Sequence, residues 1–382
     1  MTYPLEGLRV FDLSRIVAGP YAGRLLSDLG ADVVKLEGPD GDMARVWGEQ
    51  RHGLSGFYTQ QNAGKRNLGI DLKAAGAAEL ILRLAETTDI VIENFRPGVM
   101  ERLGLGWDAL HAANPRLILM SVTGFGQTGP NVGRQAFAPI IHAESGLIAR
   151  QAHFDKFSYT DPILSIADTN AAMHGLIAVL SALYQRESTG EGQHVDIAMF
   201  DAMLATDDYS HHALDAFPVR RLGGEIWDAT GGPVMIAGEF RSTWVVLRNH
   251  VEDPAPPDAD LPEKERLRRV TVGAWLNSFP DRQSLLTALE KANLAWGDVR
   301  THEEAFATSQ AEARGIIGEI DDRAGGVRRV VQAPYKFSAA EAGVRGPATH
   351  RGEHNAEVLA DWLGMSPGEV ADLTEAGVLL TS

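Results

Sequence analysis

Short strand-like runs alternate with helical stretches over the first 125 residues, and this alternation constrains the fold more than any other feature. The strand-like runs occupy residues 9–13, 32–37, 90–92 and 117–122. Helical spacing covers 18–29, where Gly30 is a typical helix stop, and recurs over 74–84. Strands joined by helical crossovers are typical of βαβ units. The sequence therefore predicts an α/β fold with a mainly parallel sheet, whose ligands lie at the carboxyl ends of the strands.

The pattern changes in the second half of the chain. A long apolar helix is expected to open at Asp168, and a strand over 195–197 follows a glycine-rich turn. Regularity then falls, which indicates a second, smaller domain, before helical spacing resumes in the tail with Val358 and Trp362 on one face. We divide the chain into a large domain over 1–205, a linker over 206–225, a small domain over 226–328 and a C-terminal segment over 329–382.

Charge and composition exclude several classes of protein. The chain has 35 basic and 51 acidic side chains and a net charge of −16, which argues against binding to nucleic acid or to an anionic membrane surface. It contains no cysteine, so disulfides, thiolate zinc sites and a cysteine nucleophile are excluded. The apolar runs are shorter than the roughly 20 residues of a membrane span. We expect a cytoplasmic enzyme.

Two motifs suggest ligands that we do not expect. Residues 124–129 match G-x-G-x-x-G after a strand, but turn residues follow where a dinucleotide site needs a helix. We interpret this motif as a glycine turn. The acidic and histidine residues within 207–212 lack the spacing of a metal site, and a solvated helix face explains them better. No metal and no tightly bound cofactor is therefore expected.

Asp168 is the carboxylate of greatest interest. An aspartate before an apolar run is usually a helix N-cap. A carboxylate at a helix N-terminus is also stabilised as an anion, which keeps it available as a nucleophile. Spacing alone leaves both interpretations open. Basic residues near the strand ends are compatible with a phosphorylated ligand; they are Arg15, Lys35, Arg45, Lys65, Arg66, Lys73, Arg96 and Arg102.

Ordered motifs over nearly the whole chain resemble one protein family. They lie at residues 12–20, 29–37, 62–67, 71–73, 93–98, 124–130, 189–196 and 351–359. In this order they resemble the class III CoA-transferase family, also called the CaiB/BaiF family. The likeness is weakest between about 220 and 330.

The resemblance implies both an architecture and a reaction. The architecture is a Rossmann-like large domain, a smaller α+β domain, a C-terminal segment that returns to the large domain, and two chains interlocked as a homodimer. The reaction moves CoA from an acyl-CoA thioester to a free carboxylic acid through a mixed anhydride and an aspartyl-CoA thioester. The position that matches the reacting aspartate is Asp168.

The resemblance also implies a set of residues that contact CoA. They are Val17, Ala18, Asp71, Leu72, Lys73, Asn94, Phe95, Arg96 and Arg102. The chain departs from some members at Gly38, where they have an arginine, and at Ala136, where they have a lysine. The glycine-rich loop that covers the acyl group in the family corresponds to residues 223–224 or to residues 231–232.

Two alternative functions remain open from the sequence. The family contains α-methylacyl-CoA racemases, which use an aspartate and a histidine. The racemase histidine falls at Phe137 or Ala138, neither of which takes a proton, although His142 is near enough to be considered with Asp168. If Asp168 only caps a helix, the chain is instead a CoA-ester-binding protein without catalysis.

Overall fold

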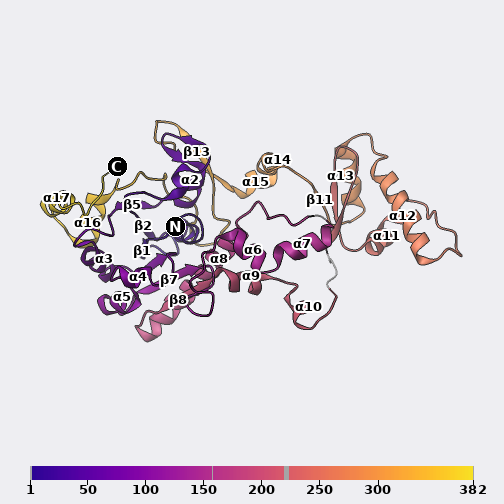
Figure 1. Cartoon of the computed structure of the whole chain (residues 1–382). Helices are drawn as coiled ribbons and strands as arrows, with labels where there is room; N and C mark the ends of the chain where they lie inside the picture. Colours follow the sequence, from indigo (N-terminus) through magenta and orange to yellow (C-terminus); the bar gives the residue numbers. More distant parts are fainter. Residues whose placement is uncertain (1, 157, 219–222, 382) are drawn as a thin grey trace. The chain divides into compact units, whose positions relative to one another are not determined.

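A six-stranded parallel sheet forms the centre of the first of two compact units in the computed structural model, which describes residues 2–156, 158–218 and 223–381 (Figure 1). Its strands are β1 (Arg9–Asp12), β2 (Asp32–Glu37), β5 (Arg66–Gly69), β6 (Ile90–Glu93), β7 (Ile118–Thr123) and β8 (His194–Ala198). They lie in the order β5-β2-β1-β6-β7-β8, with every neighbouring pair parallel. This is the doubly wound order, which reverses direction between β1 and β6. The predicted α/β class and parallel sheet are confirmed.

Helices cover both faces of this sheet because its buried residues alternate in direction. Val10 of β1 packs toward one core, whereas its neighbour Phe11 packs toward the other. The first core includes residues of α1 (Ala18–Asp28), α6 (Ala138–Glu144), α8 (Ile166–Thr189) and α9 (Met199–Thr206). The second includes residues of α3 (Ala77–Glu86), α4 (Val99–Arg102), α5 (Trp107–Ala113) and α16 (Asn355–Leu363).

The helix α3 begins three residues later than its spacing predicts. The expected start is residue 74, whereas the helix starts at Ala77. Gly76 precedes it with φ +88°, a left-handed conformation that cannot continue a helix. Residues 124–129 form turns after β7, and α6 starts only at Ala138, so the interpretation of this glycine motif as a turn is confirmed.

The long helix α8 is a core helix of the sheet. By length and composition it is apolar enough to cross a membrane, with a mean hydropathy of 1.3. Its residues Ala171, Leu176 and Val179 are buried in the first core. The expectation that Asp168 opens this helix is wrong, because α8 starts at Ile166 and Asp168 is its third residue.

Residues 314–382 return to the first compact unit of the chain, which also contains residues 1–211. They form the hairpin β12 (Ile317–Asp321) and β13 (Val327–Val331), then α16 and α17 (Pro367–Glu375). The end of the chain binds the edge strand β5, where Leu380 N–H donates to Gly69 O at 2.9 Å. Val358 and Trp362 are buried in the second core, as their helical spacing predicts.

Residues 212–313 form the second compact unit. Its antiparallel sheet contains β9 (Gly224–Trp227), β10 (Val234–Ala237) and β11 (Trp296–Asp298). Its longer helices are α11 (Phe240–Leu247), α12 (Leu261–Leu276) and α13 (Arg282–Lys291), and its shorter ones are α10 (Ser210–Leu214), which starts two residues earlier, and α14 (His302–Phe306). This unit has its own apolar core, which includes Val234, Trp244 and Leu276.

The remaining elements are short and belong mainly to the first unit. They are the 3-10 helix η1 (Met43–Val46), β3 (Gln50–Arg51), β4 (Leu54–Ser55), α2 (Gly56–Asn62), α7 (Leu147–Asp155) and α15 (Ser309–Arg314). Several of them surround a buried polar network beside β1 and β2, which bears on the site described next.

Candidate active site

The candidate site lies where the loops after β1 and β6 meet. The sheet reverses its winding between these two strands, and a crevice at the carboxyl ends of such strands is where doubly wound folds bind ligands. The side chain of Asn94 joins the two loops. Its Oδ1 accepts from Arg15 N–H, and its Nδ2 donates to Arg15 O, both at 2.8 Å. The guanidinium of Arg15 lies 5.0 Å from the centre of the Phe95 ring.

Asp168 is surrounded by the N-termini of three helices. It is the third residue of α8, and its carboxylate is stabilised by the N–H groups of Ala18, Ala138 and Asp168 itself. Ala18 and Ala138 are the first residues of α1 and α6. Helix N-termini carry partial positive charge and unpaired N–H groups, so this arrangement suits an anion.

Burial nevertheless makes Asp168 an unusually basic carboxylate. Burial raises its pKa to about 6, and the N–H groups of Ala18, Ala138 and Asp168 limit that rise. The group is therefore mostly ionised at neutral pH but more basic than an ordinary aspartate, whose pKa is about 4. A partly buried, ionised and basic carboxylate is suited to act as an oxygen nucleophile.

His142 holds the start of α8. Its ring is buried, and its Nε2 accepts a hydrogen bond from Ala167 N–H at 3.1 Å. Its Nδ1 lies 2.8 Å from Oδ1 of Asp161, so the ring proton is on Nδ1 and points at that carboxylate. The bond from Ala167 N–H to Nε2 satisfies an N–H group that a helix cap normally satisfies, which is why α8 can start before Asp168. Both nitrogens of His142 are engaged in these two bonds.

Most of the residues expected to contact CoA follow three strands of the central sheet, β1, β5 and β6, and Arg102 ends α4. Val17 and Ala18 follow β1 and are buried at the start of α1. Residues 71–73 follow β5, and residues 94–96 follow β6. Parallel strands place all three loops at one edge of the sheet. Their contact with CoA stays a prediction.

The basic residues divide into two groups. Lys35, Lys65 and Arg45 are buried or nearly so and form ion pairs with Asp42, Asp12 and Glu37. Arg66 pairs with Asp32 and Asp361. The hypothesis that these four contribute to a phosphate site is therefore wrong, because internal carboxylates take their charges. Arg15, Lys73, Arg96 and Arg102 are exposed, and among the described residues none of the four has an ion-pair partner.

Sequence reasoning missed two acidic residues that shape the loops. Glu93 ends β6, and its Oε2 accepts from Phe95 N–H at 2.7 Å. Burial raises the pKa of Glu93 to about 7, against the effect of its hydrogen bonds from Ser121 and Phe95. Asp42 is buried and binds the backbone of the loop after β1. An acidic residue in a Gly-Asp turn looks solvated in sequence, so no local signal reveals Asp42.

Two positions that depart from the family pattern contribute no charge to the site. Gly38 and Ala136 have no side chain that binds an anion.

The two candidates for the glycine-rich loop, residues 223–224 and residues 231–232, both belong to the second compact unit. Within the described part of the chain, no three histidine, aspartate or glutamate side chains are grouped to hold a metal ion.

Comparisons with known proteins agree with this geometry. The model of CoA-transferase family III matches residues 5–355. Succinate–glutarate CoA-transferase of Agrobacterium fabrum is 33% identical, covering 94% of this chain and 95% of its own. Formyl-CoA:oxalate CoA-transferase of Streptomyces avermitilis is 30% identical, covering 99% and 100%. The crystal structure of a CaiB/BaiF family protein from Brucella suis superposes with a TM-score of 0.81 at 29% identity, covering 95% of this chain and all of that one.

The basicity of Asp168 predicts a measurable titration and a stability effect. In carboxyl NMR of the labelled protein, one aspartate should titrate near pH 6 and be missing from Asp168→Asn. A carboxyl whose pKa is higher folded than unfolded costs stability as pH rises from about 4 to about 6. At about pH 7 the Asp168→Asn variant should therefore unfold at equal or higher urea than the wild type, and this advantage should vanish below about pH 4. A variant that is less stable at neutral pH would show that the carboxylate serves the fold instead.

Proposed function

The chain belongs to CoA-transferase family III, and from this premise we propose that Asp168 is the carboxylate on which it transfers CoA from an acyl-CoA thioester to a free carboxylic acid. The observation that carries the proposal is the position of Asp168, half-buried against the N–H groups of Ala18 and Ala138 with a pKa of about 6. The CoA ester is a substrate, and no tightly bound cofactor is proposed.

The first half of the reaction loads CoA onto the enzyme. An ionised oxygen of Asp168 attacks the thioester carbonyl, the C–S bond breaks, and a mixed anhydride and CoA thiolate result. The thiolate then attacks the Asp168 carbonyl of the anhydride. The donor acid leaves as a carboxylate, and Asp168 carries CoA as a thioester. The N–H groups of Ala18 and Ala138 are placed to stabilise negative charge on the oxygens of this carbonyl.

The second half repeats these steps in reverse with another acid. The acceptor carboxylate attacks the aspartyl thioester and expels CoA thiolate, which gives a second anhydride. The thiolate attacks the acceptor carbonyl of that anhydride, releases the new acyl-CoA and restores the Asp168 carboxylate. Relatives of the chain are named for succinate, glutarate, D-citramalate and oxalate. We propose that the acids belong to the class of short dicarboxylates.

The racemase alternative needs a histidine that exchanges a proton with the α-carbon of the substrate. His142 is the nearest histidine by sequence, and its Nε2 already accepts the hydrogen bond from Ala167. The alternative of a CoA-ester-binding protein without catalysis needs Asp168 to act as a helix cap, but Ser165 holds the N-cap position. Both observations support the transferase proposal.

The anionic parts of CoA are assigned to three of the exposed cations, Lys73, Arg96 and Arg102. The protein repels a polyanion at long range because its net charge is −16, but this field is screened within about 8 Å at physiological salt. Local cations at the carboxyl edge of the sheet therefore decide binding. A guanidinium can hold phosphate through two parallel hydrogen bonds, which makes Arg102 the sharper test.

We also propose that two chains interlock as a homodimer in the cytoplasm. Support comes from an exposed apolar face of α8, where Met173, Ile177 and Tyr184 are 42%, 61% and 85% exposed. Residues four and seven apart on a helix share one side. Contiguous apolar surface of this kind marks contact with another protein.

Asp168→Asn should abolish transfer while preserving binding of the CoA ester. Asparagine keeps the size and the helix position but cannot form the anhydride. With an acyl-CoA and no acceptor, the wild type should gain the mass of CoA on Asp168, located by peptide mass spectrometry, and the variant should not. Transfer that survives in Asp168→Asn would refute the proposal. Loss of α-deuterium from the substrate without CoA transfer would indicate the racemase.

Arg102→Ala should raise KM for the CoA ester by roughly tenfold or more and change kcat little. Charge-assisted hydrogen bonds contribute about 1.5–3 kcal/mol to binding, and Arg102 is not assigned to the reacting carbonyl. Arg83→Ala on the exposed side of α3 removes the same charge and should change neither constant. An unchanged KM with a thousandfold lower kcat would instead place Arg102 beside the acyl group.

The dimer should survive dilution to nanomolar concentration in sedimentation velocity. Interlocked chains separate only by unfolding, so labelled subunits should exchange at the rate of unfolding rather than by mass action. A folded monomer at that concentration, or rapid exchange under native conditions, would refute interlocking.

A further inference from the structure

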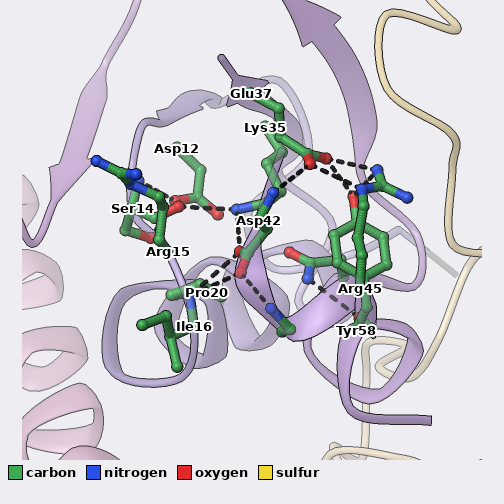
Figure 2. A network of polar contacts seen from close by, with 12 residues as sticks. Asp12, Ser14, Arg15, Ile16, Pro20, Lys35, Glu37, Asp42, Arg45 and Tyr58 are labelled. Atoms are coloured by element: carbon green, nitrogen blue, oxygen red, sulfur yellow. Dashed lines mark hydrogen bonds and ion pairs between the residues drawn. The ribbon is translucent and has the colours of Figure 1, made fainter. Parts of the chain in front are cut away.

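The loop after β1 contains a strained residue, Ile16. It lies two positions before Ala18, whose N–H stabilises the carboxylate of the candidate nucleophile Asp168. Ile16 has φ +73°, a left-handed conformation that β-branched residues rarely adopt. Such conformations persist only when surrounding contacts enforce them, and they concentrate at functional sites. The contacts that enforce this one are visible in Figure 2.

Asp42 and Lys35 pair with each other, and both form hydrogen bonds to the backbone of this loop. Ile16 N–H donates to the two carboxylate oxygens of Asp42 at 3.2 and 3.1 Å. Lys35 Nζ lies 3.0 Å from Asp42 Oδ2 and donates to Ser14 O at 2.7 Å. Both side chains are almost completely buried. One buried ion pair therefore holds the backbone on both sides of Arg15.

Side chains from different elements take every N–H of this segment. Ser14 N–H donates to Asp12 Oδ1 at 3.0 Å, and Arg15 N–H donates to Asn94 Oδ1 at 2.8 Å. Ile16 N–H donates to Asp42. The acceptors of these three bonds lie at the end of β1, in the loop after β6 and in the loop after β2. The loop has no regular backbone pairing, so its shape depends on these side chains.

The strained residue lies directly before the start of α1. Val17 is the N-cap of α1, and Ala18 is its first residue. The N–H of Ala18 stabilises the carboxylate of Asp168. A rotation at Ile16 would therefore swing this N–H away from Asp168.

We propose that Asp42 is a positioning residue for the reaction at Asp168: with Lys35, it holds Ile16 in its left-handed conformation and so aims the N–H of Ala18 at the carboxylate. This inference rests on the proposed role of Asp168 as nucleophile. Asp42 acts through the backbone, because its carboxylate oxygens bind Ile16, Ala44 and Lys35.

Asp42→Ala tests the proposal through two signals. Turnover should fall on the order of tenfold or more, because small displacements of catalytic groups are costly. Loss of the Ala18 N–H should also raise the pKa of Asp168, which moves the acid limb of the kcat profile and the NMR titration of Asp168 to higher pH. Asp40→Ala removes the same charge from an exposed position two residues away and should change neither signal.

A second substitution separates positioning from a general loss of structure. Ile16→Gly removes the strain, because glycine adopts positive φ freely. Added to Asp42→Ala, it should return part of the turnover and bring the Asp168 titration back toward about pH 6. If Asp42→Ala does not fold, Asp42→Asn takes its place: it keeps one acceptor for Ile16 but loses the ion pair with Lys35, so both signals should move in the same direction by a smaller amount.

The outcomes distinguish this inference from the proposed function. An Asp168 titration and turnover unchanged in Asp42→Ala, or no recovery in the double variant, would overturn the positioning role. Transfer that persists in Asp168→Asn would overturn the proposed function, whereas the NMR titration would still report whether Asp42 aims the Ala18 N–H.

Discussion

The buried ion pair between Lys65 and Asp12 is the interaction on which the arrangement of the site depends. Their Nζ and Oδ2 atoms lie 2.7 Å apart, and neither side chain is exposed. Lys65 also donates to Pro20 O at 2.8 Å, which ties the first turn of α1 to the end of β1. A Cβ at Gly23 would lie 2.8 Å from the Asp12 carboxylate, so α1 can approach this pair only with glycine there. Breaking such a pair leaves an uncompensated charge and costs about 3–5 kcal/mol.

Five of the six strands could be predicted from the sequence because each contains a short run of apolar residues, whereas the edge strand β5, with the sequence RNLG, gives no such signal. The bounds of β2 are as expected, and α1 differs by one residue at its end. The start of α8 could not be predicted, because its N–H partner is His142, which lies 25 residues before Ala167. The residues alone single out Asp168 as a carboxylate at a helix start, but only the family resemblance assigns it a reaction, since its basicity depends on helices that the fold brings together.

The distribution of positive charge reconciles an acidic protein with an anionic substrate. Lys35 and Lys65 are enclosed with carboxylates and serve the fold. The sequence cannot separate them from Lys73, because lysines within a strand, before a strand and in the loop after it look alike until burial is known. Lys73, Arg96 and Arg102 stay exposed in or near the loops after β5 and β6, where they are available to an anion.

The groups that hold Asp168 are main-chain N–H groups, and this gives the site a particular tolerance to mutation. Any residue except proline supplies the same donor at positions 18 and 138, provided that the helices keep their starts. Evolution can therefore exchange the side chains around the carboxylate, and with them the acids that are accepted, without dismantling the anion-binding frame. Only Asp168 itself must keep its residue type, because the donors around it are set by where the helices begin.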